Sequence, residues 1–285
     1  MIINKYAENL TEENGIFFSK NKSEISYPKD GNEVCFKLED NSFWFKHRNN
    51  CIVEIVKKYS PNKTFFDIGG ANGFVAKGLE ENGIKTVLVE PGIEGCMNAK
   101  KRGLKNIICS TLEDAGFKAD SIPVAGLFDV VEHIDNDILF LKKLYTYMRP
   151  EGLLFITVPA YNFLWSKEDV EAGHYRRYTL RKLKRTLENT GFETVYSTYI
   201  FSFLIFLILL FRTIPSILGL AKTGQKKSEK EHRIANMRGR EGKSLINSIL
   251  TLILSLEIQQ ISKKKRLLFG GSCLIVAKKK YDTVQ

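Results

Sequence analysis

The sequence predicts an α/β fold with a largely parallel sheet, and three features of the stretch 64–91 predict it. An apolar run ends in Asp67 and is followed at once by a cluster of glycines. A segment compatible with a helix comes next, and a second β-rich run, 86–89, then ends at the acidic residue Glu90. Strand, glycine turn, helix, strand and carboxylate is the order found in the first half of nucleotide-binding sheets.

The glycine turn is the first candidate site. Gly69, Gly70 and Gly73 have no side chains, so a ligand can approach the backbone, and the following helix supplies free N–H groups. Glu90, at the carboxyl end of the second strand, is placed to accept hydrogen bonds from two ribose hydroxyls. A dinucleotide fingerprint requires G-x-G-x-x-G, but Ile68 stands where its first glycine belongs. That departure disfavours an NAD-dependent oxidoreductase.

The motif D-I-G-G-x-x-G at 67–73 resembles motif I of the class I S-adenosylmethionine-dependent methyltransferases. Glu90-Pro91 is similar to their ribose-binding acid, and 107–114 lies where their adenine-binding turn falls. Residues 127–134 resemble their fourth-strand end with the Glu-His pair of small-molecule enzymes. The resemblance covers 41–200 and 271–279, and extends to ubiquinone-type O-methyltransferases and enzymes of surface-glycan clusters. It implies a Rossmann-like seven-stranded methyltransferase sheet.

The same resemblance implies S-adenosyl-L-methionine as cofactor and a set of residues that bind it. Asp67 would order the glycine turn and reach the amino group of the cofactor through water. Thr111 stands where the family often has an aspartate at the adenine amine, which leaves one hydrogen bond there. The expected cofactor-binding residues are Asp67, Gly69, Gly70, Ala71, Gly73, Glu90, Pro91, Thr111, Leu112, Glu113, Phe128 and Asp129.

The acceptor site is expected after the fifth strand, where His-Tyr-Arg-Arg-Tyr-Thr begins at His174. Paired arginines suit phosphate or carboxylate recognition, and tyrosines can frame a ring or acyl group. Alternatively, one arginine pairs with Glu168, Asp169 or Glu171 to fix the loop. His133 has a structural role as readily as a catalytic one. The candidates are His174 as general base with His133 as the second histidine, and Tyr175, Arg176, Arg177 and Tyr178 for the substrate.

Seven strands are expected in chain order from apolar, β-branched runs bounded by turns. Residues 148–152 read as a turn before the fifth strand. Thr179 is a plausible N-cap for a helix over 180–189, which Gly191 ends. The resemblance implies that the last strand is inserted antiparallel between the fifth and sixth. The expected strands are 64–68, 86–89, 106–109, 124–129, 153–158, 192–200 and 272–278.

Three units are expected: an N-terminal lid segment at 1–60, the methyltransferase domain at 61–199 plus 271–280, and a helical insertion at 200–270. Residues 1–60 read as an entry segment outside the sheet, with helical periodicity over 41–59. Trp44, Phe45, His47 and Arg48 either form part of a lid over the cofactor, or belong to the core with Arg48 in a structural ion pair.

The insertion is apolar and basic. Residues 200–211 contain one polar residue, Ser202, and a second apolar segment covers 245–261. Neither reaches the ~20 apolar residues of a bilayer span. The chain carries a net charge of +11, and 15 of its 43 basic residues against 5 of its 32 acidic ones follow residue 221. Two readings stay open: peripheral contact of 200–266 with an anionic membrane, or a helical cap that packs on the domain or in a homodimer.

Five scattered cysteines, with no C-x-x-C and no histidine pairing, argue against a disulfide framework and a zinc site, so no metal is expected. No N-terminal signal segment is visible, and a cytoplasmic protein, at the inner face of the membrane or free, is expected. The basic segment lacks interleaved aromatics, which disfavours nucleic acid.

These observations together predict a methyltransferase that methylates a small molecule. We expect O-methylation first and C-methylation second, on a lipid-linked, phosphate-containing or hydrophobic acceptor. The alternative is a cofactor-binding, membrane-associated partner protein without turnover.

Overall fold

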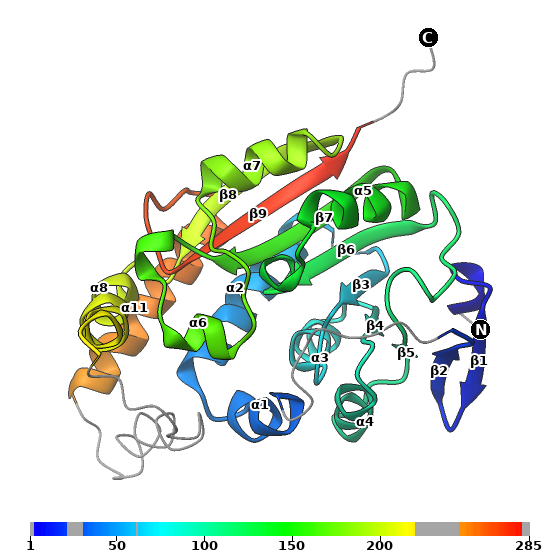
Figure 1. The fold of residues 1–285 in the computed structure, drawn as a ribbon, viewed down its shortest axis with the longest axis horizontal. Helices are drawn as coiled ribbons and strands as arrows, with labels where there is room; N and C mark the ends of the chain where they lie inside the picture. Colours follow the sequence, from blue (N-terminus) through cyan, green and yellow to red (C-terminus); the bar gives the residue numbers. More distant parts are fainter. Residues whose placement is uncertain (1–2, 22–30, 61, 220–244, 281–285) are drawn as a thin grey trace.

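The computed structural model describes residues 3–21, 31–60, 62–219 and 245–280, and a nine-stranded mixed sheet runs through them (Figure 1). The strand order is β1-β2-β5-β4-β3-β6-β7-β9-β8. The strands are β1 Leu10–Glu13, β2 Ile16–Ser19, β3 Phe65–Ile68, β4 Thr86–Val89, β5 Ile107–Cys109, β6 Ile122–Phe128, β7 Met148–Pro159, β8 Phe192–Ile200 and β9 Ser272–Lys279.

The seven strands β3 to β9 confirm the expected sheet within a few residues at each end. Strands β5, β4, β3, β6 and β7 are parallel neighbours, so their carboxyl ends meet at one edge. Strand β9 pairs antiparallel with both β7 and β8, as the sequence predicted. This arrangement places all the loops that follow the parallel strands together.

Two sequence-based expectations about the sheet were wrong. Residues 1–60 are not outside it, because β1 and β2 form a hairpin and β2 pairs with β5, Phe17 opposite Ile108. The buried Ile16 and Phe17 cover an edge that β5 would otherwise leave open. The expected turn at 148–152 is the beginning of β7, and it is accommodated by a register shift against β6 between Ile122 and Val124.

Helices cover both faces of the sheet because its strands are apolar on both sides. Phe66 packs on the face covered by α5 (Asp137–Tyr147) and α7 (Leu180–Glu188). Phe65 packs on the other face, with α2 (Phe43–Tyr59), α3 (Phe74–Glu81) and α11 (Leu245–Ser262). Helices α1 (Gly31–Glu39) and α4 (Ile93–Lys101) lie side by side next to α3 (Figure 1). The short elements are η1 Ile3–Lys5, η2 Val131–His133, η3 Asn162–Leu164 and α6 Lys167–Glu171.

The insertion is helical over 204–217 and 245–262. The first apolar segment forms α8 (Leu204–Ile208), a π-helical turn η4 (Leu209–Thr213) and α9 (Ile214–Ile217), and the second forms α11, which packs along α2. Among the described residues, no helix combines the length and the apolar character needed to cross a bilayer. The basic stretch 222–243 lies outside the described residues.

Candidate active site

The glycine turn after β3 has a backbone that few side chains tolerate. Gly69, Ala71 and Gly73 all have positive φ, at 69°, 47° and 70°. A Cβ on Gly70 would lie 2.5 Å from Asp67 Oδ2 and 2.4 Å from Leu88 Cδ1. The protein's own packing therefore already requires a residue without a side chain at position 70.

Asp67 lies beneath this turn and is fully buried. Its Oδ2 accepts a hydrogen bond from Ala76 N at 3.1 Å, while its Oδ1 has no partner among the described residues. Burial raises the pKa of Asp67 to about 7, against the opposing influence of Arg48. A buried carboxylate oxygen without a partner is suited to a ligand's hydrogen-bond donor.

Glu90, at the end of β4, faces the same turn. Its Oε2 accepts from Ala71 N at 2.9 Å, and its Oε1 accepts from Gly92 N at 2.8 Å. Burial raises the pKa of Glu90 to about 7 although these two N–H groups oppose the shift. Pro91 continues the loop, and its carbonyl oxygen lies 3.8 Å from Cys109 Sγ. The chain thus holds an acid beside a left-handed backbone turn.

The other residues expected around the cofactor follow β5 and β6. Thr111 Oγ1 accepts from Asp114 N at 3.1 Å and so stabilises its own turn. Leu112 is buried in the core and Glu113 is exposed. Phe128 stacks on Phe65, with ring centroids 6.0 Å apart. These positions border the carboxyl edge of the sheet.

Helix α2 closes over this edge and links it to the insertion. Arg48 forms an ion pair with Asp129, which has a positive φ of 57° and also accepts from Thr157 Oγ1 at 3.0 Å. Trp44 stacks on Phe201 with centroids 3.7 Å apart. Arg48 is thus in an ion pair and Trp44 packs within the protein, as in the second reading of these residues, and the partner of Arg48 belongs to the expected cofactor site.

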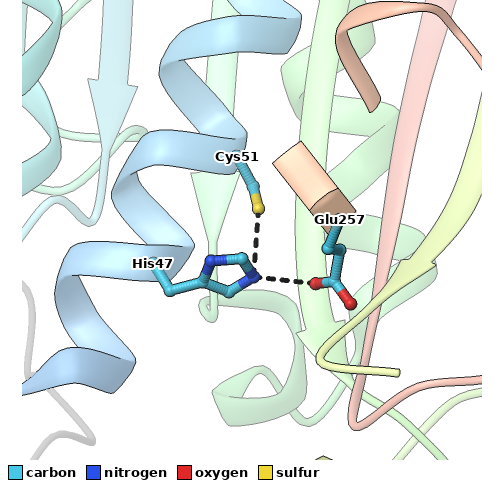
Figure 2. Close-up of side chains that lie close together, drawn as sticks. All are labelled: His47, Cys51 and Glu257. Atoms are coloured by element: carbon cyan, nitrogen blue, oxygen red, sulfur yellow. Dashed lines mark hydrogen bonds and ion pairs between the residues drawn. The ribbon is translucent and has the colours of Figure 1, made fainter. Parts of the chain in front are cut away.

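His47 points away from the carboxyl edge. Its Nε2 lies 2.8 Å from Glu257 Oε1 on α11 and 3.5 Å from Cys51 Sγ, as Figure 2 shows. Glu257 also accepts from the backbone N–H groups of Phe201, at 2.6 Å, and Ser202, at 2.8 Å. Burial alone would raise the pKa of Glu257, but His47 first, and then the N–H groups of Ser202 and Phe201, hold that pKa below its usual value. This buried cluster attaches the insertion to α2.

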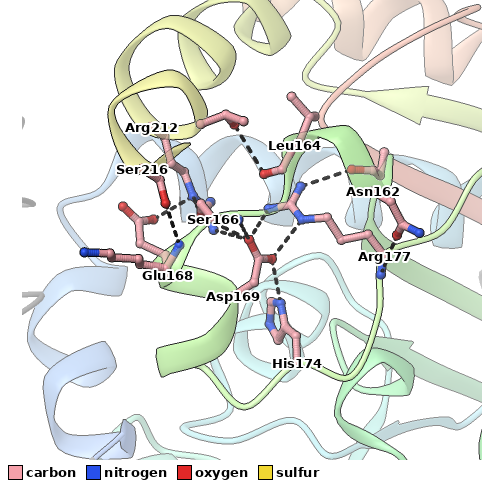
Figure 3. Close-up of polar contacts among 12 residues, drawn as sticks. Asn162, Leu164, Ser166, Glu168, Asp169, His174, Arg177, Arg212 and Ser216 are labelled. Carbon is pink, nitrogen blue, oxygen red and sulfur yellow. Dashed lines mark hydrogen bonds and ion pairs between the residues drawn. The ribbon is translucent and has the colours of Figure 1, made fainter. Parts of the chain in front are cut away.

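On the acceptor side, Asp169 is the centre of a polar network (Figure 3). Arg177 donates to both of its oxygens, at 2.8 and 3.0 Å, and Arg212 of the insertion donates at 3.3 Å. His174 Nδ1 lies 2.9 Å from Asp169 Oδ1. Burial alone would raise the pKa of Asp169, but the hydrogen bonds from His174 and Arg177 outweigh it and hold that pKa well below its usual range.

Several residues expected to bind substrate have structural roles instead. Arg177 is 3% exposed and is committed to Asp169 and the Ala160 carbonyl, so the alternative reading of an arginine that fixes the loop is the one observed. Tyr178 is buried and donates to Asp137 Oδ2 at 2.6 Å.

The other two expected substrate residues, Arg176 and Tyr175, are partly exposed to solvent. Arg176 pairs with Asp137 at 3.2 Å and donates to the Asp135 carbonyl, while its side chain is 22% exposed. Tyr175 remains exposed. Of the four expected substrate residues, Tyr175 is therefore the most accessible.

The loop that carries His174 is bound against the turn after β6. Tyr175 N donates to the Glu132 carbonyl at 2.8 Å, and the rings of His133 and His174 meet edge to face with centroids 4.7 Å apart. Glu132 is fully buried, and neither carboxylate oxygen has a hydrogen-bond partner in the described structure. Burial, and next the charge of Asp129, raises the pKa of Glu132 well above its usual value.

Sequence reasoning did not assign Asp169 or the Glu132 side chain to the site. Asp169 was considered only as an arginine partner, and Glu132 only as part of the Glu-His pair. Acidic residues are rarely fully buried, so burial itself marks both of them as unusual. That signal can be used only once the folded structure shows which acids are buried. An open cavity of about 400 Å³ lies at the opposite edge of the sheet, near Lys63 and Arg149, and is remote from all these residues.

Comparisons with known proteins follow this geometry. The model of a family described as a methyltransferase domain matches residues 44–197. A search of curated proteins gives no match. Many solved structures share the fold.

One similar structure is phosphoethanolamine N-methyltransferase 2 of Haemonchus contortus with S-adenosyl-L-methionine, at 17% identity and a TM-score of 0.54. The alignment covers 93% of this chain but only 62% of that one, so the chain spans less than two thirds of that protein's length.

Two further structures cover most of both chains. A putative methyltransferase in complex with the Trm112 activator of Haloferax volcanii is 13% identical, with a TM-score of 0.55 and coverage of 92% and 100%. The plantazolicin methyltransferase, solved with a triazolic desmethylPZN analogue and S-adenosylhomocysteine, is 13% identical, with a TM-score of 0.52 and coverage of 90% and 92%. At these identities the likeness shows the fold.

Proposed function

The chain belongs to the methyltransferase family whose model spans residues 44–197, and on that premise we propose that it transfers a methyl group from S-adenosylmethionine to a hydroxyl of a small-molecule acceptor. The observation that carries the proposal is the pair of buried acids, Asp67 and Glu90, on either side of a left-handed backbone turn. Such a pair fits a ligand that offers several hydrogen-bond donors at once.

The residues present fit the donor. Glu90, which already accepts from Ala71 N and Gly92 N, would accept from the two ribose hydroxyls with its remaining lone pairs, and the unpaired Oδ1 of Asp67 is suited to an amino group reached through water. Thr111, Leu112 and Glu113 would border the adenine, while Phe128 and Asp129 would line the methionine end. When bound, S-adenosylmethionine supplies an electrophilic methyl group on a sulfonium sulfur.

His174 is proposed to activate the acceptor. Displacement at a methyl carbon is an in-line reaction, so positioning supplies much of the rate. A hydroxyl acceptor must also lose its proton, and a histidine oriented by a carboxylate is suited to take it. With Nδ1 toward Asp169, His174 has Nε2 left for that step, with His133 and the exposed Tyr175 beside it.

A hydrophobic or lipid-linked acceptor at the cytoplasmic face of a membrane is proposed from the surface of the insertion. Ten large apolar side chains are exposed there, and the same insertion carries the basic run 263–266. Apolar side chains beside lysines suit the interface of an anionic bilayer. The exposed residues are Phe203, Phe206, Leu210, Ile214, Ile217, Leu218, Leu252, Leu256, Leu268 and Phe269.

The donor assignment is tested by calorimetric titration of the purified chain with S-adenosylhomocysteine and, separately, NADH. We expect S-adenosylhomocysteine to bind and NADH not to, and Glu90→Ala to weaken binding by about 100-fold through two lost hydrogen bonds to a charged group. Glu188→Ala, at an exposed position on α7 outside the proposed site, is the matched control. Affinity for NADH, or an unchanged affinity in Glu90→Ala, would contradict the assignment. Binding without turnover in any cell extract would favour the partner-protein alternative.

The membrane proposal is tested by co-sedimentation with vesicles of phosphatidylcholine alone and with phosphatidylglycerol. We expect pelleting with the anionic vesicles, and its loss when Phe206, Leu210 and Ile217 are changed to serine. The same change at the exposed Leu139 and Val170, outside the insertion, should leave pelleting intact. If the chain instead stays in the supernatant as a stable homodimer, the result would favour the alternative in which the insertion is a helical cap that packs on the domain or in a homodimer.

A further inference from the structure

Glu132, His133 and His174 bring three metal-ligand groups together at the acceptor side of the site. Their candidate ligand atoms all lie within 4.8 Å of one another. Glu132 and His133 belong to η2, directly after β6, and His174 comes from the loop after α6. The hydrogen bond from Tyr175 N to the Glu132 carbonyl fixes the two segments against each other. The folded chain, and not a local motif, creates the cluster.

The Glu132 carboxyl is the strongest sign that something binds here. It is fully buried, and both of its oxygens lack a hydrogen-bond partner among the described residues. Buried carboxyls normally have partners, and such an exception needs an explanation such as an ion. A cation at this position would satisfy both oxygens and compensate for the lost hydration.

His174 has the orientation of a typical metal ligand. Metal-binding histidines usually donate the second ring N–H to a carboxylate, which fixes the tautomer and the ring. His174 Nδ1 lies 2.9 Å from Asp169 Oδ1, and Arg177 keeps that carboxylate ionised (Figure 3). The lone pair of Nε2 is therefore directed away from Asp169, toward the side where His133 lies.

We infer that Glu132, His133 and His174 bind one divalent first-row transition ion, such as Zn²⁺, with open positions for water and for the acceptor oxygen. Two imidazoles and one carboxylate suit such an ion and leave part of its coordination sphere free. The sequence argued against a metal because its cysteines showed no C-x-x-C and no pairing with histidines, and this set contains no cysteine.

The inference deepens the proposed function and rests on it for the role of the ion. The acceptor hydroxyl loses its proton to water, its oxygen forms the bond to the methyl carbon, and the carbon–sulfur bond breaks to leave a thioether. A cation beside that oxygen favours loss of the proton. With the ion bound, His174 Nε2 is a metal ligand, so His174 activates the acceptor through the ion, and this replaces the direct proton transfer to His174 proposed above.

Metal binding is measured without turnover, by titrating chelator-treated protein with Co²⁺ and following its visible absorption and stoichiometry. We expect one ion per chain. Glu132→Gln and His174→Gln should each lower the Co²⁺ affinity at least about 100-fold, because mutating a residue that only hydrogen-bonds to a metal ligand already lowers metal affinity about 10–100-fold. Zn²⁺ should raise the melting temperature of the unmodified chain and leave that of Glu132→Gln unchanged.

The matched control is Cys51→Ala, because His47, Cys51 and Glu257 form a second group with ligand atoms within 4.8 Å (Figure 2). Binding should survive in that variant. No bound Co²⁺, or binding lost in Cys51→Ala and kept in Glu132→Gln, would overturn the inference. S-adenosylhomocysteine titrations of the same metal-free samples report on the donor site and on folding. Retained donor binding without Co²⁺ binding would therefore refute the metal site alone.

Discussion

The proposed donor side and the proposed acceptor side of this site are built by different kinds of bond. On the donor side, backbone N–H groups hold the acids over short distances in sequence: Ala76 to Asp67 across 9 residues and Ala71 to Glu90 across 19. On the acceptor side, side chains hold one another: His174 and Arg177 contact Asp169 from 5 and 8 residues away, and Arg212 of the insertion contacts it across 43 residues. The first design depends on a local turn, and the second depends on the whole fold and its insertion.

The largest test of this contrast is Asp169→Asn. The substitution removes the charge that compensates the buried Arg177, and breaking such a pair costs about 3–5 kcal/mol. Urea unfolding should show this loss, while S-adenosylhomocysteine affinity should change by less than about threefold. Glu168→Gln, whose carboxyl pairs with Arg212 nearer the surface, should cost at most about 1 kcal/mol. A large loss of donor affinity in Asp169→Asn would show that the two sides are not independent.

An intermediate effect is expected from Glu257→Ala. It leaves Phe201 N, Ser202 N and His47 without their acceptor, at a cost of about 2–4 kcal/mol. Amide hydrogen exchange should accelerate in 201–219 and 245–262 and stay unchanged around β3 and β4. Gln259 is an exposed neighbour on the same helix, and the free energy of unfolding of Gln259→Ala should lie within about 0.5 kcal/mol of that of the unmodified chain. Faster exchange throughout the sheet would mean that the insertion does not open separately.

The smallest effect is the pH dependence of the donor side. The folded pKa of Asp67 and of Glu90 is raised to about 7, so their protonated forms favour the folded state, and that contribution is lost as pH rises through 7. The ribose hydroxyls of S-adenosylhomocysteine require the ionised form of Glu90 as their acceptor. The affinity for S-adenosylhomocysteine should therefore fall as the pH drops below 7, by up to about tenfold per pH unit. Calorimetry from pH 5.5 to 8, with Glu90→Gln as the flat control, measures it. An equal slope in Glu90→Gln would assign the titration elsewhere.

The sequence was sufficient for the parts that depend on local patterns. Apolar runs with turn residues at their ends placed β3 to β9, and the family resemblance supplied the position of β9. The hairpin β1–β2 was missed because it is short and at an edge, and three of the four residues of β1 are polar or charged and exposed. Pairing of β2 with β5 is a tertiary event with no local signal.

The acceptor side could not be assigned in the same way. Arginine is a residue type that often binds phosphate, so the sequence suggested that role for Arg177. Only its burial against Asp169 shows that it supports the loop. Glu132 is one acid among 32, and its unpaired state appears only after folding. Pairs between side chains follow no fixed spacing that a single sequence would reveal, whereas a glycine turn has a recognisable spacing.

The position of β9 has a consequence for synthesis of the chain. Strand β9 fills the slot between β7 and β8, yet it is the last of the three to leave the ribosome. Until residues 272–279 emerge, two strand edges and the apolar helices beside them stay uncovered. A nascent polypeptide that stalls before Ser272 would expose a ready template for pairing with other chains, so we expect this interval to depend most on chaperones.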